Sequence, residues 1–102
     1  MIEFQFFADC PHAGETLQNL RDVMSELGIT GDQLIILEVP DIATSRRMQF
    51  QGSPTILVKG KDIYTGEKPT GFNYSCRLYE FDGEKTEAIP KYFIRDKLAG
   101  YK

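Results

Sequence analysis

The alternation of apolar and polar residues divides the chain into short strands and helices. Residues 2–7 alternate and then become apolar, which predicts a buried strand that ends just before Cys10. From Ala13 onward apolar residues recur every three or four positions, which predicts one buried face of a helix. These residues are Leu17, Leu20, Val23, Met24 and Leu27. Gly28 follows them, where glycine suits a left-handed C-terminal cap.

A second strand is predicted at residues 34–39, which are almost continuously apolar. Such a run is typical of a strand covered on both faces. A strand, a helix and a second covered strand make a βαβ unit, so we expect these two strands to be parallel. A short helix is predicted from Ile42 to Met48, with Arg46 and Arg47 on its solvent side.

The second half of the chain is predicted to contain two hairpins and a helix. Pro54 stands at the start of an apolar strand, where it removes no ladder hydrogen bond, and a turn leads to residues 62–64. Residues 65–75 form a loop that is long for so small a domain, which hints at a function. A second hairpin is predicted within residues 78–88. A last helix is predicted at residues 90–98, with its apolar side chains on one face.

Composition limits the range of function. The 102 residues, 41% of them hydrophobic and 26% charged, fit one globular domain covering residues 1–102. The net charge of -3 gives no basic surface for nucleic acid. No apolar run is long enough for a membrane span, and no charged segment precedes the first apolar run. We therefore expect a soluble cytoplasmic protein that binds neither nucleic acid nor membrane.

Two cysteines, Cys10 and Cys76, carry the candidate chemistry. They are too few for a disulfide scaffold. Together with His12, the one histidine, they cannot complete a four-ligand structural zinc site of Cys and His. In a reducing compartment such cysteines are functional or inert rather than structural.

Cys10 lies at a predicted helix start, where unpaired N–H groups and the helix dipole stabilise a thiolate. Pro11 suits the first helical position, because its missing N–H would be unpaired there anyway. His12, if charged, would lower the pKa of the thiol further, whereas Asp9 and Glu15 would raise it. The sequence leaves this balance open.

Two short motifs resemble the thioredoxin superfamily. They are Cys10-Pro11 at the first strand–helix junction and Gly52-Ser53-Pro54-Thr55 at the third strand, in the order β-α-β-α-β-β-α. With Phe50-Gln51 and Val58-Lys59-Gly60-Lys61-Asp62, the chain looks similar to small prokaryotic glutaredoxin-like or thioredoxin-like proteins. The resemblance covers residues 1–64 and the last helix. It implies a three-layer α/β fold around a central mixed sheet, with an extra loop and hairpin before the last helix.

The resemblance also implies a substrate groove. In that superfamily Pro54 would be a cis-proline facing the Cys10 sulfur, and the Ser53 backbone would pair with an extended thiol substrate. Pro11 and His12 would lie beside this groove. The hydroxyls of Ser53 and Thr55 are candidate hydrogen-bond donors to the thiolate.

One departure from the superfamily pattern limits the possible routes of thiol–disulfide exchange. Dithiol members have Cys-X-X-Cys, whereas this chain has Cys10-Pro11-His12-Ala13. Exchange within the motif is therefore excluded. Two routes remain: a mixed disulfide with glutathione as co-substrate, or resolution by Cys76. The second route requires the loop to fold back until the two Cα atoms lie within about 7 Å.

Three functions are compatible with these residues. The first is a glutaredoxin-like (monothiol) thiol-disulfide oxidoreductase that uses Cys10, with a thiol or disulfide substrate or glutathione as its partner. The second is binding of a soft ion such as Hg(II), Cu(I) or As(III) through Cys10 and Cys76. The third is a non-catalytic interaction domain. No resident cofactor or metal is expected, His12 is expected to be exposed, and Arg77 to be a solvated charge unless it stabilises a thiolate or holds an anion.

Overall fold

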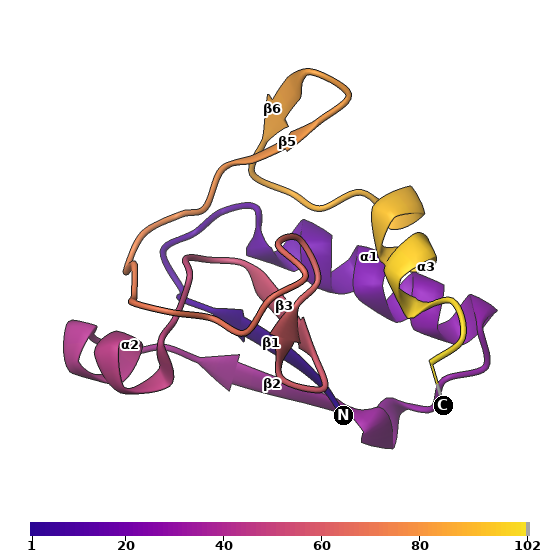
Figure 1. Ribbon diagram of the computed structural model, residues 1–102, viewed down its shortest axis with the longest axis horizontal. Coiled ribbons are helices and arrows are strands. Elements are labelled where there is room, and N and C mark those ends of the chain that lie inside the picture. Colours follow the sequence, from indigo (N-terminus) through magenta and orange to yellow (C-terminus); the bar gives the residue numbers. More distant parts are fainter. Residues whose placement is uncertain (102) are drawn as a thin grey trace.

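The computed structural model describes residues 1–101, which form an α/β fold of three α-helices and a mixed sheet (Figure 1). The helices are α1 (Ala13–Glu26), α2 (Ile42–Met48) and α3 (Lys91–Leu98), and a 3-10 turn covers Gly31–Gln33. The strands are β1 (Ile2–Phe6), β2 (Leu34–Glu38), β3 (Thr55–Val58), β4 (Lys61–Asp62), β5 (Tyr79–Phe81) and β6 (Glu84–Thr86). The predicted α/β class is confirmed.

The four-stranded sheet has the order β2-β1-β3-β4. Strand β1 runs parallel to β2 and antiparallel to β3, so Phe4 lies between Ile36 and Ile56. Because β1 and β3 are antiparallel, the end of one strand lies beside the start of the other, with Gln5 opposite Thr55. This register brings the segment after β1, which carries Cys10, next to the segment that enters β3.

Helices α1 and α3 lie side by side against one face of the sheet (Figure 1). Their buried faces and the sheet form the core, whose members include Ile2, Phe4, Leu20, Val23, Ile56, Ile94 and Leu98. Burial of large apolar side chains contributes about 1.5–3 kcal/mol each, so this core dominates the stability of the fold. Strands β5 and β6 form a separate two-stranded sheet, which adds the buried Tyr79 to this core.

The predicted C-terminal end of α1 is confirmed, whereas the predicted N-terminal end is wrong. At the C-terminus Gly28 has a φ of 72°, and the Ile29 N–H donates to the Met24 carbonyl over 2.8 Å, which confirms the predicted left-handed cap. At the N-terminus the helix begins at Ala13, with His12 as the cap residue. Pro11 therefore precedes the helix, and the prediction that it occupies the first helical position is wrong.

Strand β2 is correctly predicted but is not covered on both faces. It lies at the edge of the sheet, and Ile35 and Ile36 are exposed. The apolar run reflects the preference of branched side chains for extended backbone, which does not depend on whether a helix covers both faces. Within residues 1–101, no helix is both long enough and apolar enough to cross a membrane.

Candidate two-thiol site

The long segment between β4 and β5 returns across the entrance to β3. There Ser53 donates its N–H to the Ser75 carbonyl over 2.8 Å, and its own carbonyl accepts from the Arg77 N–H over 2.8 Å. These two bonds form an isolated parallel bridge between Ser53 and Cys76. We call residues 75–77 the strap. Its backbone fixes Cys76 directly opposite Ser53.

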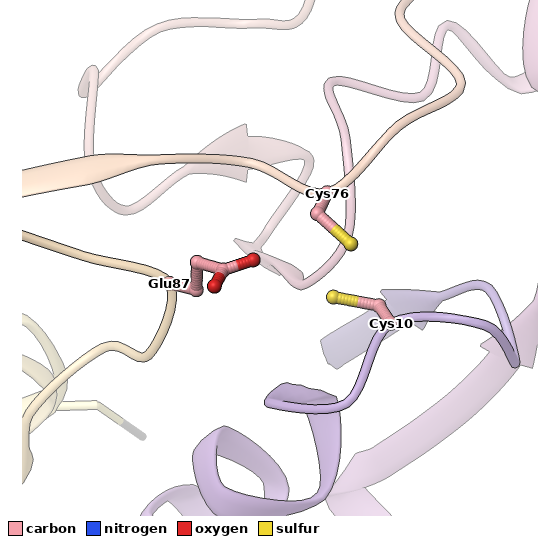
Figure 2. A group of neighbouring side chains, drawn as sticks. All are labelled: Cys10, Cys76 and Glu87. Carbon is pink, nitrogen blue, oxygen red and sulfur yellow. The ribbon is translucent and has the colours of Figure 1, made fainter.

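Three reactive side chains meet at the strap. The Sγ atoms of Cys10 and Cys76 and a carboxylate oxygen of Glu87 all lie within 4.8 Å of one another, and Figure 2 shows them pointing toward a common centre. They come from the turn before α1, from the strap and from the segment after β6. The loop thus folds back far enough to bring the two sulfur atoms close together, and both cysteines are free thiols.

Ser53 also contacts the Cys10 sulfur. The Sγ of Cys10 donates to the Ser53 carbonyl oxygen over 3.4 Å, and Cys10 is only 5% exposed. One peptide unit therefore positions both thiols: its carbonyl contacts Cys10, and the same carbonyl pairs with the residue after Cys76. The Ser53–Pro54 bond is cis, as the resemblance implied.

Neighbouring groups hold the proton on Cys76. A hydrogen bond to the Cys10 sulfur, burial, the negative charge of Cys10 and the carboxylates of Glu87 and Asp9 raise the pKa of Cys76 to about 11. Cys76 therefore remains a thiol at neutral pH.

A buried ion pair anchors the strap. Arg77 Nη1 lies 2.6 Å from Asp62 Oδ2 and 3.1 Å from Thr55 Oγ1, and its guanidinium lies 4.6 Å from the Tyr79 ring centre. The two charged side chains are 12% and 2% exposed. The expectation that Arg77 is a solvated charge is wrong, because Asp62 at the end of β4 offers it a buried partner that no local sequence pattern reveals.

Two further contacts hold the strap at the entrance to β3. The Tyr79 hydroxyl donates to the Pro54 carbonyl over 2.5 Å, and burial raises the pKa of this phenol. Gly52 has a φ of 110°, and a Cβ there would lie 3.0 Å from the Arg77 Cβ and 3.3 Å from the Ser75 carbonyl oxygen. Only glycine allows the strap to approach this closely.

The hydroxyls of Ser53 and Thr55 form hydrogen bonds with backbone groups and not with the Cys10 sulfur. Ser53 Oγ accepts from the Phe7 N–H over 3.1 Å, and Thr55 Oγ1 donates to the Gly52 carbonyl over 2.5 Å. Both hydroxyls therefore fix the turn around the cis bond. The backbone carbonyl of Ser53, rather than a hydroxyl, is the group that contacts Cys10.

The remaining predicted residues lie at the rim of the site. Pro11 and His12 are exposed, and His12 Nε2 lies 3.6 Å from a carboxylate oxygen of Glu87 while Nδ1 lies 3.7 Å from Glu15. Sequence reasoning missed Glu87 itself. Its place near the thiols results from the path of the second hairpin, and in sequence it is one acidic residue among 15.

Cys10 also borders an apolar groove between the start of α1 and the edge strand β2. The groove has a volume of about 210 Å³ and is lined by Phe4, Phe6, Ala8, Cys10, Leu17 and Ile36 among others. It offers apolar contact next to a reactive sulfur.

Fold and site together define an α/β protein in which Cys10, which follows the central strand β1, lies close to the Cys76 thiol and the Glu87 carboxylate. In comparisons with known proteins, no family model, no curated protein and no solved structure matches this chain.

Proposed function

We propose that the protein is a thiol–disulfide oxidoreductase in which Cys10 is the nucleophile and Cys76 the resolving thiol. The observation that carries this proposal is the approach of the two sulfurs to within 4.8 Å across the Ser53 bridge. Two cysteines 66 positions apart in sequence meet only because the strap pairs with Ser53. The proposal replaces the monothiol expectation with a pair built from two distant segments.

The reaction has two exchange steps. The Cys10 thiolate attacks an external disulfide, forms a mixed disulfide, and releases one partner thiolate, which takes up a proton. Cys76 then loses its proton and attacks the Cys10 sulfur, releasing the second partner thiolate. The external disulfide gains two electrons and two protons, and Cys10 and Cys76 become a disulfide.

The electrostatics of the pair support this order of events. The hydrogen bond to the Cys10 sulfur and the charge of Cys10 contribute to the raised pKa of Cys76. Once Cys10 is part of a mixed disulfide it carries no charge. The pKa of Cys76 then falls, so the resolving thiol becomes a better nucleophile when it is needed.

The resemblance to the thioredoxin superfamily supports the proposal independently. In that superfamily the backbone before the cis-proline pairs with an extended thiol substrate. Here both hydrogen-bonding groups of Ser53 are occupied by the strap, so Cys76 takes the position of such a substrate thiol. The protein thus carries its own thiol partner.

A small disulfide fits this arrangement better than a folded protein does. Cys10 is 5% exposed beneath the strap, and the groove beside it has a volume of about 210 Å³. We propose glutathione disulfide as the model substrate and glutathione as reductant. A reducing cytoplasm, the compartment expected from the sequence, would keep the pair as dithiols.

Reaction with glutathione disulfide, followed by intact-mass spectrometry, tests the two roles. The wild-type protein should lose two hydrogens with only transient glutathionylation, whereas Cys76→Ser should accumulate one glutathione on Cys10. Cys10→Ser should react with glutathione disulfide at least about 100-fold more slowly, because the remaining thiol, Cys76, does not occupy the place of the attacking sulfur. A Cys10→Ser variant that reacts at the wild-type rate would contradict the proposal.

A further inference from the structure

We propose that the reduced protein binds one divalent zinc ion through Cys10, Cys76 and Glu87. This activity goes beyond disulfide exchange, because it needs the carboxylate, which exchange does not use. It also differs from sulfur-only binding of a soft ion by two cysteines. The ligand set is two sulfurs and one oxygen, all converging on one point (Figure 2).

The distances between the three ligand atoms suit a tetrahedral ion. Zinc binds thiolate sulfur at about 2.3 Å and carboxylate oxygen at about 2.0–2.2 Å, so two sulfurs on one zinc lie about 3.8 Å apart. The ligand atoms of Cys10, Cys76 and Glu87 lie within 4.8 Å of one another. A closing movement of about 1 Å or less completes the site.

Two parts of the fold hold the three ligands. The backbone around Ser53 fixes both cysteines. After Glu87 the chain is tied to α1, because the Ile89 N–H donates to Thr16 Oγ1 over 3.0 Å and Asn19 donates to the Ile89 carbonyl over 2.9 Å. Preformed positions of this kind lower the cost of ordering the ligands.

His12 lies beside the carboxylate at the rim. Its Nε2 lies 3.6 Å from Glu87 Oε2, within ion-pair distance. Glu87 itself is half-exposed, so an ion can enter from solvent on this side.

The mixed donor set selects the class of ion. Cu(I) and Hg(II) favour sulfur alone, whereas Mg²⁺ and Ca²⁺ favour oxygen alone. Zinc accepts thiolate and carboxylate in one site. Three protein ligands leave a fourth position for water, which is the pattern of open rather than structural zinc sites.

Binding and exchange exclude each other. A Cys10–Cys76 disulfide removes both sulfur ligands, so only the reduced protein can bind the ion. Conversely, a bound ion occupies both thiolates and should slow their reaction with glutathione disulfide.

Titration of the reduced wild-type protein with Co²⁺ under argon, followed by displacement with Zn²⁺, tests the proposal. We expect a thiolate-to-cobalt charge-transfer band that saturates at one ion per chain and disappears when zinc is added. Cys76→Ser should lose the band. Glu87→Gln should weaken Zn²⁺ affinity by at least about tenfold, whereas Glu84→Gln, an exposed acid on the same hairpin, should leave it unchanged.

Three results would each overturn the proposal: no charge-transfer band, a ratio of one ion to two chains, or a Glu87→Gln variant that binds Zn²⁺ as tightly as the wild type. Disulfide exchange is measured separately, on the wild-type protein in EDTA. Intact exchange without metal binding therefore overturns the zinc site alone, and the reverse result overturns the exchange reaction alone.

Discussion

The two cysteines are positioned by very different parts of the molecule. Cys10 lies between β1 and α1, two regular elements whose side chains form the centre of the core. Cys76 lies in a segment outside the main sheet that is held by the bridge to Ser53, the Arg77–Asp62 ion pair and the Tyr79 hydroxyl. Two packed regular elements hold the backbone on either side of the first thiol, whereas the second thiol depends mainly on the backbone bridge and on the side-chain contacts of its own segment.

Because of this difference, the stability of the fold and the reactivity of the thiols depend mainly on different parts of the molecule. The core that positions Cys10 can be altered only at the expense of the whole fold. The strap can be released by single substitutions, because each of its contacts involves one or two side chains. The strap is therefore the part of the site where mutation, and local opening, should act first.

Arg77→Met should have the largest effect. It leaves Asp62, which is 2% exposed, without its charged partner, and loss of one member of a buried pair costs about 3–5 kcal/mol. We expect the free energy of unfolding in urea to fall by about 3 kcal/mol. The alkylation of Cys10 by iodoacetamide should also become faster, because the strap no longer covers it.

Arg47→Met is the matched control for this variant. Arg47 is exposed on α2 and donates a 3.4 Å hydrogen bond to Thr44 Oγ1, so stability and alkylation should stay close to wild type. Equal effects of the two arginine substitutions would show that the buried ion pair does not anchor the strap.

Gly52→Ala should have an intermediate effect. The new Cβ would meet Arg77 and Ser75 at 3.0–3.3 Å, and the φ of 110° is strained for alanine. We expect a loss of roughly 1–3 kcal/mol, accompanied by faster alkylation of Cys76.

Gly71→Ala provides the comparison, since its φ of 67° is also left-handed but no atom lies within 4 Å of the new Cβ. It should cost about 1 kcal/mol and leave alkylation unchanged. Faster alkylation of Cys76 in this control as well would show that backbone strain, and not displacement of the strap, opens the site.

The ion pairs between α1 and α3 should have the smallest effect. A hydrogen bond to Lys91 lowers the pKa of Asp22, and one to Arg95 lowers the pKa of Glu26. A carboxylate with a lowered folded-state pKa stabilises the fold above its unfolded pKa and loses that contribution as pH falls through the folded value. Lys91→Met should therefore lower the thermal midpoint slightly at neutral pH.

The difference between the thermal midpoints of Lys91→Met and wild type should shrink as the pH falls through the lowered folded-state pKa of Asp22, because Asp22 then loses its charge. A large difference at neutral pH, or one that persists in acid, would show that Lys91 contributes through packing. This small effect contrasts with Arg77, whose ion pair is buried.

Most of the fold could be predicted from the sequence because periodicity reports local structure. The helices, β1, β2 and both hairpins lie where apolar spacing and Gly or Pro positions predicted them, within a few residues. The burial of β2 was predicted wrongly, since an apolar run does not reveal whether a strand is central or at the edge. The start of α1 was placed too early for a similar reason: Pro11 suits the turn before a helix as well as its first residue.

The site was predictable only in part. Cys10 and the Ser53-Pro54 turn were identified from motifs next to regular elements. Glu87 and the structural role of Arg77 were missed, because both depend on contacts between segments separated by many residues: Glu87 with Cys10, and Arg77 with Asp62. No periodicity encodes such contacts, and only the folded path of the strap and hairpin reveals them.

The central claim is that Cys10 and Cys76 form one two-electron pair. The most direct test equilibrates dilute protein with glutathione buffers of graded redox ratio, quenches in acid, and maps disulfides by peptide mass spectrometry. We predict a single Cys10–Cys76 disulfide within the monomer, formed and lost in one two-electron transition. Separate glutathionylation of the two cysteines, with no bond between them at any ratio, would contradict the account.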